Sequence, residues 1–185
     1  MTENTEKKIL DAALNVFAKK GRDAATTKAI AEKAGRTEMT LFRKFGSKKN
    51  LFDQVMIQSV EKMQKDIEIL FSELDQKYDN PKDFLNIFIK KTAKFYMDNI
   101  EAFTLILNDD NNSMNRIMGE IYSFTGKFLE RNIPHRDFDY KTMGIYIFSF
   151  IYAITLERYQ GRSADVDYKK SLEKFQDNLA LCVVK

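Results

Sequence analysis

Residues 26–45 read Thr-Thr-Lys-Ala-Ile-Ala-Glu-Lys-Ala-Gly-Arg-Thr-Glu-Met-Thr-Leu-Phe-Arg-Lys-Phe and contain two short helical patterns separated by one glycine. The hydroxyl of Thr26 or Thr27 can cap the first helix, and Thr37 can cap the second, which runs from about Glu38 to Lys44. Gly35 between them can adopt the positive φ that other residues resist. Two short helices joined by a glycine turn predict a helix-turn-helix.

Apolar residues at helical spacing extend this prediction in both directions. A first helix is expected over about Thr5–Lys20, with Gly21 placed to end it. Ser47 is expected to cap a much longer fourth helix that continues to the turn at Tyr78–Pro81. We therefore predict a helix-turn-helix domain over residues 1–46 and a helical domain over residues 47–185.

The C-terminal part shows the same helical spacing. Asn80 and Pro81 predict the start of a fifth helix. A break near Asp98–Asn99 is expected to separate this helix from a short helix around Ala102–Leu107. Further helices are expected before Pro134 and over two final ranges, 139–160 and 165–184. The fold class is all-α, with a three-helix DNA-binding domain, a helical bundle, and about nine helices in total.

Charge is distributed unevenly along the chain. Residues 1–50 hold 12 Lys and Arg against 6 Asp and Glu, whereas the chain as a whole has a net charge of +3. A basic head on a mildly acidic body indicates that the head binds a polyanion such as double-stranded DNA. No uncharged apolar stretch reaches the ~18 residues of a membrane span, and the charged N-terminus does not resemble a secretory signal. We expect a cytoplasmic protein.

Several side chains of the predicted helix-turn-helix suit contacts with DNA. The helix after the turn presents Thr37, Glu38, Met39, Thr40, Arg43 and Lys44 outward. Arg43 can pair with guanine, Met39 can lie against a thymine methyl, and Glu38 can accept from a cytosine amine. Thr27, Lys28 and Lys48 stand at helix starts and suit phosphates.

The first fifty residues resemble the DNA-binding head of the TetR (tetracycline-repressor-like) family of regulators. Ile9-Leu10-Asp11-Ala12-Ala13-Leu14 with Phe17 and Gly21 is similar to the family's first helix, and Ile30-Ala31-Glu32-Lys33-Ala34-Gly35 to its second helix and turn. Thr40-Leu41-Phe42 with Phe45, and Ser47-Lys48 with Leu51, resemble the third helix and the start of the fourth. The resemblance implies phosphate or base contacts at Thr27, Lys28, Thr40, Phe42, Lys44 and Lys48.

Four residues depart from the family's pattern at the surface expected to meet DNA. The family usually has Tyr where Phe42 stands, and Phe42 lacks a hydroxyl to bind phosphate. Arg36 and Met39 replace a small apolar residue and a glycine, so Arg36 is either an additional phosphate contact or a surface residue of the turn. Glu38 is either a base contact or a first-turn carboxylate favoured by the helix dipole.

The stretch from Met143 to Leu156 has 14 residues without a charge and is apolar on every face. A helix of this kind must be covered on all sides, and a second subunit can cover one of them. The last helix also carries an apolar stripe, which includes Leu172, Phe175 and Leu179. We therefore predict a homodimer through the last two helices, the arrangement that the resemblance also implies; a central core helix of a monomer is the alternative.

Aromatic residues and methionines are dense between residues 84 and 152 and can line an apolar cavity or form ordinary core. The resemblance implies a small-molecule effector somewhere in this bundle. We expect a hydrophobic or aromatic molecule, because few buried charges are available to hold a polar one. The candidate lining residues are Phe88, Phe95, Tyr96, Phe103, Met114, Met118, Tyr122, Met143 and Tyr146.

Two other classes of protein are alternatives to a DNA-binding regulator. For a small helical enzyme the sequence offers no nucleophile motif, no metal-ligand cluster and no glycine-rich phosphate loop, so no catalytic residue, metal or cofactor is predicted. Its single His135 lies in a predicted loop, its single Cys182 lies on the apolar last helix, and Asp109–Asn112 is expected to be a polar surface turn. The other alternative is a helical protein-interaction module whose basic head binds acidic partners.

Overall fold

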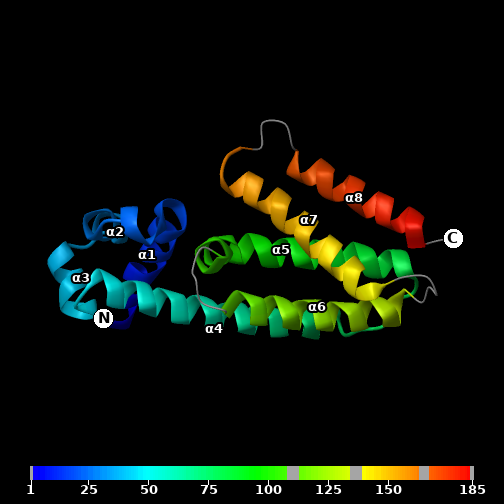
Figure 1. Ribbon diagram of the computed structural model, residues 1–185, viewed down its shortest axis with the longest axis horizontal. Coiled ribbons are helices and arrows are strands. Elements are labelled where there is room, and N and C mark those ends of the chain that lie inside the picture. Colours follow the sequence, from blue (N-terminus) through cyan, green and yellow to red (C-terminus); the bar gives the residue numbers. More distant parts are fainter. Residues whose placement is uncertain (1, 108–112, 134–138, 163–166, 184–185) are drawn as a thin grey trace. The chain divides into compact units, whose positions relative to one another are not determined.

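The computed structural model of the chain (Figure 1) describes residues 2–107, 113–133, 139–162 and 167–183, which form helices and their connections. His135 and the Asp109–Asn112 turn lie outside these residues, as do the side chains of Met114 and Cys182. The described part contains eight helices: α1 (Thr2–Ala24), α2 (Thr27–Ala34), α3 (Glu38–Phe45), α4 (Lys48–Leu74), α5 (Pro81–Leu107), α6 (Ser113–Asn132), α7 (Tyr140–Tyr159) and α8 (Tyr168–Val183). The predicted all-α fold class is confirmed.

One expected boundary is wrong. The break near Asp98–Asn99 does not occur within the described residues, because α5 continues from Pro81 to Leu107 as one helix. The Asn99 side chain lies within this helix and donates to the Phe95 carbonyl, at 3.0 Å, and to Asp66 on α4, at 2.9 Å. Of the polar pair that resembled a helix end in the sequence, Asn99 is therefore buried in a tertiary contact, and the described residues contain eight helices where about nine were expected.

The expected capping residues lie at the helix starts. The Thr26 hydroxyl accepts from the Ala29 N–H at 3.1 Å, and the Ser47 hydroxyl accepts from the Asn50 N–H at 3.1 Å. Asn80 caps α5 through the Asp83 N–H at 3.0 Å. Each cap satisfies a backbone donor that the helix leaves unpaired. Local sequence chemistry thus places the helix starts correctly.

The described chain divides into two compact units, Met1–Gln64 with Glu101–Met114, and Lys65–Ile100 with Asn115–Lys185. The first unit is built on α1–α3, whose buried stripes meet each other and the start of α4. Phe17 on α1 and Phe52 on α4 pack edge to face with ring centroids 5.1 Å apart. Leu105, near the end of α5, is buried in the same apolar core. The last turns of α5 therefore belong to the unit that holds the predicted helix-turn-helix.

The second unit is a bundle with an aromatic core. Phe88 and Tyr96 on α5 each lie 6.0 Å, between ring centroids, from Phe148 on α7. Gly144, one turn before Phe148, allows a close approach to α6, because a Cβ at this position would lie only 2.8 Å from Cγ2 of Thr125. No helix among those described is both long and apolar enough to span a membrane.

We predict that Gly144→Ala lowers the free energy of unfolding by about 1–3 kcal/mol, because the added methyl overpacks the contact with Thr125. Gly119→Ala on α6 is the control: a Cβ there meets no atom within 4 Å, so the better helix propensity of alanine should raise stability by about 0.5–1 kcal/mol. Urea denaturation followed by circular dichroism measures both. Equal effects of the two substitutions would show that the α6–α7 contact is looser than described.

Candidate nucleic-acid interface

The turn between α2 and α3 is fixed by Gly35 and two backbone hydrogen bonds. Gly35 has φ 64° and ψ 40°, the left-handed conformation expected of it. Its N–H donates to the Glu32 carbonyl at 3.1 Å, and the Arg36 N–H donates to the Ala31 carbonyl at 2.9 Å. This pair of bonds is the Schellman arrangement, which satisfies carbonyls at a helix C-terminus. The chain therefore leaves α2 in one defined direction and enters α3 three residues later.

The helix α3 is held by its start and by one buried face. The Thr37 hydroxyl accepts from the Thr40 N–H at 3.2 Å and lies 3.0 Å from the Thr40 hydroxyl. Leu41 and Phe45 are buried in the core of the first unit. The opposite face stays outside that core, with Met39 80% exposed and Arg43 exposed. A short helix with one anchored face and one exposed face can enter a DNA groove as a rigid element.

Glu38 has a partner within the protein. Its carboxylate Oε2 accepts a hydrogen bond from the Thr27 hydroxyl at 2.5 Å. The contact ties the first turn of α3 to the first turn of α2, where the sequence predicted a phosphate contact for Thr27. The two predicted DNA-contacting residues are thus brought together. The structure adds a role for Thr27 and Glu38 in positioning α2 against α3. The sequence did not indicate this role, because no local pattern links two residues at this spacing.

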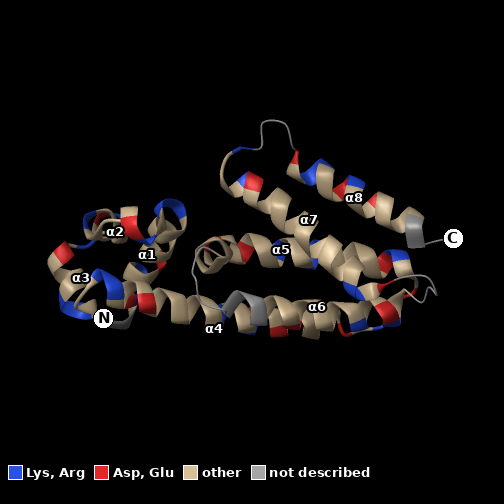
Figure 2. Ribbon diagram, viewed as in Figure 1, with Lys and Arg blue, Asp and Glu red and all other residues tan. Residues whose placement is uncertain are grey.

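The basic residues of this region lie on α1–α3 and at the start of α4 (Figure 2). Lys28 and Arg43 are exposed. Lys44 lies 3.5 Å, between Nζ and Oε2, from Glu6 on α1. Lys48 donates through Nζ to the carbonyls of Asp23, at 3.2 Å, and Ala25, at 3.0 Å. The cations in the last turn of α3 and at the start of α4 are therefore held by groups of α1 and of the segment that follows it.

Arg36 and Phe42, two departures from the family pattern, also have definite positions. The Arg36 guanidinium donates to the Gly35 carbonyl at 2.9 Å and to the Thr5 hydroxyl at 3.4 Å. It therefore folds back along the turn, toward α1. Phe42 is half-exposed and lies on α3 next to Arg43 in the sequence.

The residues predicted to line a ligand cavity do not meet in one place. Phe88 and Tyr96 meet around Phe148 in the second unit, whereas Phe103 is buried in the first unit. Tyr146 is exposed on α7 and contacts Phe175 on α8, with ring centroids 5.8 Å apart. Met118, Tyr122 and Met143 are partly buried on α6 and α7.

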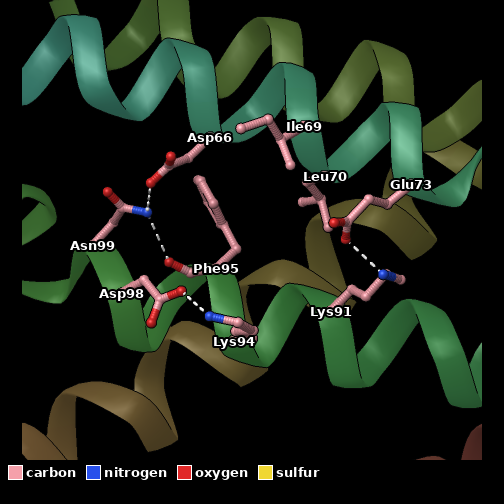
Figure 3. A pocket seen from close by; sticks show the side chains of 9 residues that line it. All are labelled: Asp66, Ile69, Leu70, Glu73, Lys91, Lys94, Phe95, Asp98 and Asn99. Atoms are coloured by element: carbon pink, nitrogen blue, oxygen red, sulfur yellow. Dashed lines mark hydrogen bonds and ion pairs between the residues drawn. The ribbon is translucent and has the colours of Figure 1, made fainter.

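Phe95 faces a different space from its neighbour Tyr96. It projects from α5 toward α4 in a groove of about 320 Å³ (Figure 3). The groove is lined by ion pairs as well as apolar groups: Lys91 Nζ lies 2.6 Å from Glu73 Oε2, and Lys94 pairs with Asp98. The sequence pattern had placed Phe95 and Tyr96 in one cavity, but adjacent helical residues point to different faces.

Three tyrosines lie around the aromatic core of the second unit. Burial holds the pKa of Tyr96 well above its ordinary value, and the neighbouring Tyr122 and Tyr152 raise that pKa further. Burial also raises the pKa of Tyr122 and the pKa of Tyr152. The three phenols therefore remain neutral hydrogen-bonding groups in the physiological pH range.

Comparisons with known proteins agree with this geometry. Residues 9–55 match the family model described as bacterial regulatory proteins, tetR family. A curated relative, the uncharacterized HTH-type transcriptional regulator YvkB of Bacillus subtilis, is 34% identical over 102 residues, which cover 49% of this chain and 54% of that protein. The matched region thus spans about half the length of that relative.

Two solved structures share the fold over nearly the whole chain. A TetR-like transcriptional regulator from Rhodococcus sp. RHA1 has a TM-score of 0.66 at 17% identity and covers 93% of this chain and 91% of its own. FadR from Bacillus subtilis, in complex with stearoyl-CoA, has a TM-score of 0.63 at 19% identity and covers 97% of both chains. The chain thus carries a helix-turn-helix segment similar to that of the tetR family over residues 9–55, and its fold resembles that of TetR-like regulators.

Proposed function

We propose that the chain is a transcriptional repressor that binds a pseudo-palindromic DNA site as a homodimer and releases it when a small molecule binds. One observation carries the proposal: α3 is anchored through Leu41 and Phe45 and leaves Met39 and Arg43 exposed, directly after a turn fixed by Gly35. Residues 1–46 bind DNA, and residues 47–185 provide the dimer interface and the effector site.

The base contacts come from α3 in the major groove. Arg43 pairs with a guanine through two hydrogen bonds, and Met39 lies against a thymine methyl. Thr37 and Thr40 approach the groove at the first turn of the helix. The Glu38 carboxylate already accepts a hydrogen bond from the Thr27 hydroxyl. Its primary role is therefore to orient α2 and α3.

The phosphate contacts surround this helix. Lys28 and Lys48 stand at helix starts, where backbone N–H groups and the positive end of the helix dipole also favour an anion. Lys44, in the last turn of α3, contacts a phosphate through its charge alone. The carbonyls of Asp23 and Ala25 hold the Lys48 ammonium group, and from this position the ammonium group contacts a phosphate. Phe42 packs against the sugar-phosphate backbone, since it has no hydroxyl to donate. Arg36 remains part of the turn through Thr5.

The dimer is proposed to form through α7 and α8. Large apolar side chains are exposed on both helices, with Tyr146 60% and Leu181 72% accessible. Exposed large apolar side chains favour protein association, because association removes them from water. Ile145, Ser149 and Ala153 follow one another at four-residue spacing on an exposed face of α7, where small side chains allow a partner helix to approach. The proposed partner is a second copy of the chain.

Release by a small molecule is proposed because the second unit has an aromatic core and because a protein of the same fold, FadR of Bacillus subtilis, is described in complex with stearoyl-CoA. An effector that binds better to a conformation unable to hold both heads on DNA shifts the population toward that conformation. The affinity for DNA then falls by at most the ratio of the effector's affinities for the two conformations.

Two alternatives make different predictions. A protein-interaction module would bind DNA without preferring any sequence, and an enzyme would need a constellation of reactive groups. Within the described residues no three His, Cys, Asp or Glu side chains are grouped so that they could hold a metal ion. The test measures the affinity for a duplex that the protein selects from a random pool and for a scrambled duplex, over a series of salt concentrations. Of the three classes, only a repressor combines a sequence preference with an affinity that falls steeply with salt.

We predict that Arg43→Ala weakens binding to the selected duplex by about 1–3 kcal/mol and relaxes the preference at one base pair, because a bidentate contact to guanine is lost. Arg131→Ala is the charge-matched control, since Arg131 lies on α6 and pairs with Asp75 at 2.8 Å. Fluorescence anisotropy measures both affinities. An unchanged affinity for Arg43→Ala would remove this residue from the base-contacting surface.

We also predict that the protein is a dimer at micromolar concentration and that Ala153→Arg makes it monomeric, because an unpaired charge cannot be buried at low cost between two copies of α7. Ser123→Arg, at an exposed position of α6, should leave the dimer intact. Sedimentation velocity gives the masses, and circular dichroism checks that both variants are folded. A wild-type monomer, or a dimer that tolerates Ala153→Arg, would contradict the proposed interface.

A further inference from the structure

The first two turns of α1 contact the segment that is proposed to bind DNA. The Lys44 ammonium, in the last turn of α3, lies 3.5 Å from Oε2 of Glu6. The residue before Glu6, Thr5, accepts a hydrogen bond from the Arg36 guanidinium at 3.4 Å. Two consecutive residues of α1 thus each contact one cation of the turn and helix that follow α2.

The burial of neighbouring residues fixes where Glu6 and Lys44 stand. Ile9 and Leu10 follow Glu6 by three and four residues and are buried, and residues at these spacings share one face of a helix. Leu41, three residues before Lys44, is also buried. The carboxylate and the ammonium therefore meet at the rim of the apolar core of the first unit.

The pair contributes little to the stability of the folded chain. The Glu6 side chain is 49% exposed, and an ion pair that is open to water is weak because water and dissolved ions screen it. The Lys44 side chain is only 19% exposed, so its stem is held by the surrounding protein. Glu6 is therefore the partner with more freedom to move, and the ammonium stays in place when the pair opens.

A carboxylate at this ammonium stands where a phosphate would bind. Carboxylate and phosphate oxygens are both anionic acceptors for an ammonium group. The ammonium has three N–H donors but only one positive charge. A phosphate that contacts Lys44 also approaches Glu6, and the two anions repel each other. DNA binding must therefore displace Glu6 from Lys44 or proceed against this repulsion.

We propose that the Glu6 carboxylate occupies the place of a DNA phosphate at Lys44 and so limits the affinity of the head for DNA of any sequence. The inference rests on the proposed function, in which Lys44 contacts a phosphate. Glu6 acts against phosphate contacts, which supply non-specific binding, and leaves the base contacts of Arg43 unchanged. This restraint reduces retention at the many non-specific sites that compete with the specific one.

The exchange of partners also changes the salt dependence of binding. A lysine that contacts a phosphate releases a condensed cation from the DNA. When the phosphate takes Lys44 from Glu6, the freed carboxylate attracts a cation from solution, so fewer cations are released in total. Removal of the Glu6 charge abolishes this uptake.

The test replaces Glu6 by glutamine, which keeps the shape of the side chain and removes its charge. We expect Glu6→Gln to bind both the selected and the scrambled duplex about two- to fivefold more tightly at low salt, because one exposed ionic interaction no longer opposes the phosphate. The slope of log affinity against log salt concentration should become steeper by up to about 0.9, which corresponds to one cation. Fluorescence anisotropy over a salt series measures both quantities.

Two further variants show whether Glu6 repels phosphate or orients Lys44. Lys44→Gln alone should bind more weakly than wild type, because the phosphate then faces an unpaired Glu6. The double variant Glu6→Gln with Lys44→Gln should recover most of that loss, since its local charge equals that of wild type. If Glu6 only orients Lys44, Glu6→Gln would weaken binding when Lys44 is present and have no effect once Lys44 is replaced.

The matched control is Glu73→Gln. Glu73 pairs with Lys91 at 2.6 Å in the second unit and is about as exposed as Glu6. Its replacement changes the net charge by the same amount, and should leave the affinity and its salt dependence close to those of wild type. Thermal unfolding followed by circular dichroism should give melting temperatures within a few degrees of wild type for all variants, because exposed ion pairs add little stability.

Three results bear against the account in different ways. An unchanged or weaker affinity of Glu6→Gln, beside a wild type that binds its selected duplex, would overturn the inference and leave the proposed function intact. An equal gain in Glu73→Gln would also overturn it, because net charge alone would then explain the effect. A wild type that binds neither duplex would contradict the proposed function, and the inference with it.

Discussion

The functional surface depends first on the left-handed conformation of Gly35. Two hydrogen bonds close α2, from the N–H groups of Gly35 and Arg36 to the carbonyls of Glu32 and Ala31. They fix the direction of the chain before Thr37 caps α3. A residue with a Cβ would strain this conformation, because a φ of 64° is costly for any L side chain. The position of Arg43 and Met39 relative to the core follows from this turn, since Leu41 and Phe45 fix the rotation of the same helix.

The contacts around the turn are linked. The Thr27–Glu38 hydrogen bond joins the first turns of α2 and α3, and the carbonyls of Asp23 and Ala25 hold Lys48 at the start of α4. Helix starts, cations and the exposed face of α3 are thus positioned together by one small core. A groove-binding element of eight residues has little stability of its own, so this support from the core is what makes it rigid.

Much of this head was predictable from the sequence, because its signals are local. The caps at Thr26, Thr37 and Ser47, the glycine turn and the spacing of the buried residues each act within a few positions along the chain. The errors and omissions concern long-range contacts. Asn99 resembled a helix end but is a buried partner of Asp66, and no local pattern indicated that Glu38 bonds Thr27 or that Glu6 pairs with Lys44. The base contacts and the ligand residues remain predictions, because side chains that meet only in a complex leave no signal in the periodicity.

The most direct test of DNA binding through α3 is guanine N7 methylation interference on duplexes selected by the protein from a random pool. If α3 lies in the major groove of each half-site, methylated guanines should block binding in two symmetric patches whose centres are about 34 Å apart, or a multiple of that distance. The opposite result would be either that no sequence is enriched, or that N7 methylation leaves binding unaffected across the selected site. Either outcome would contradict the assignment of α3 as the helix that contacts the bases.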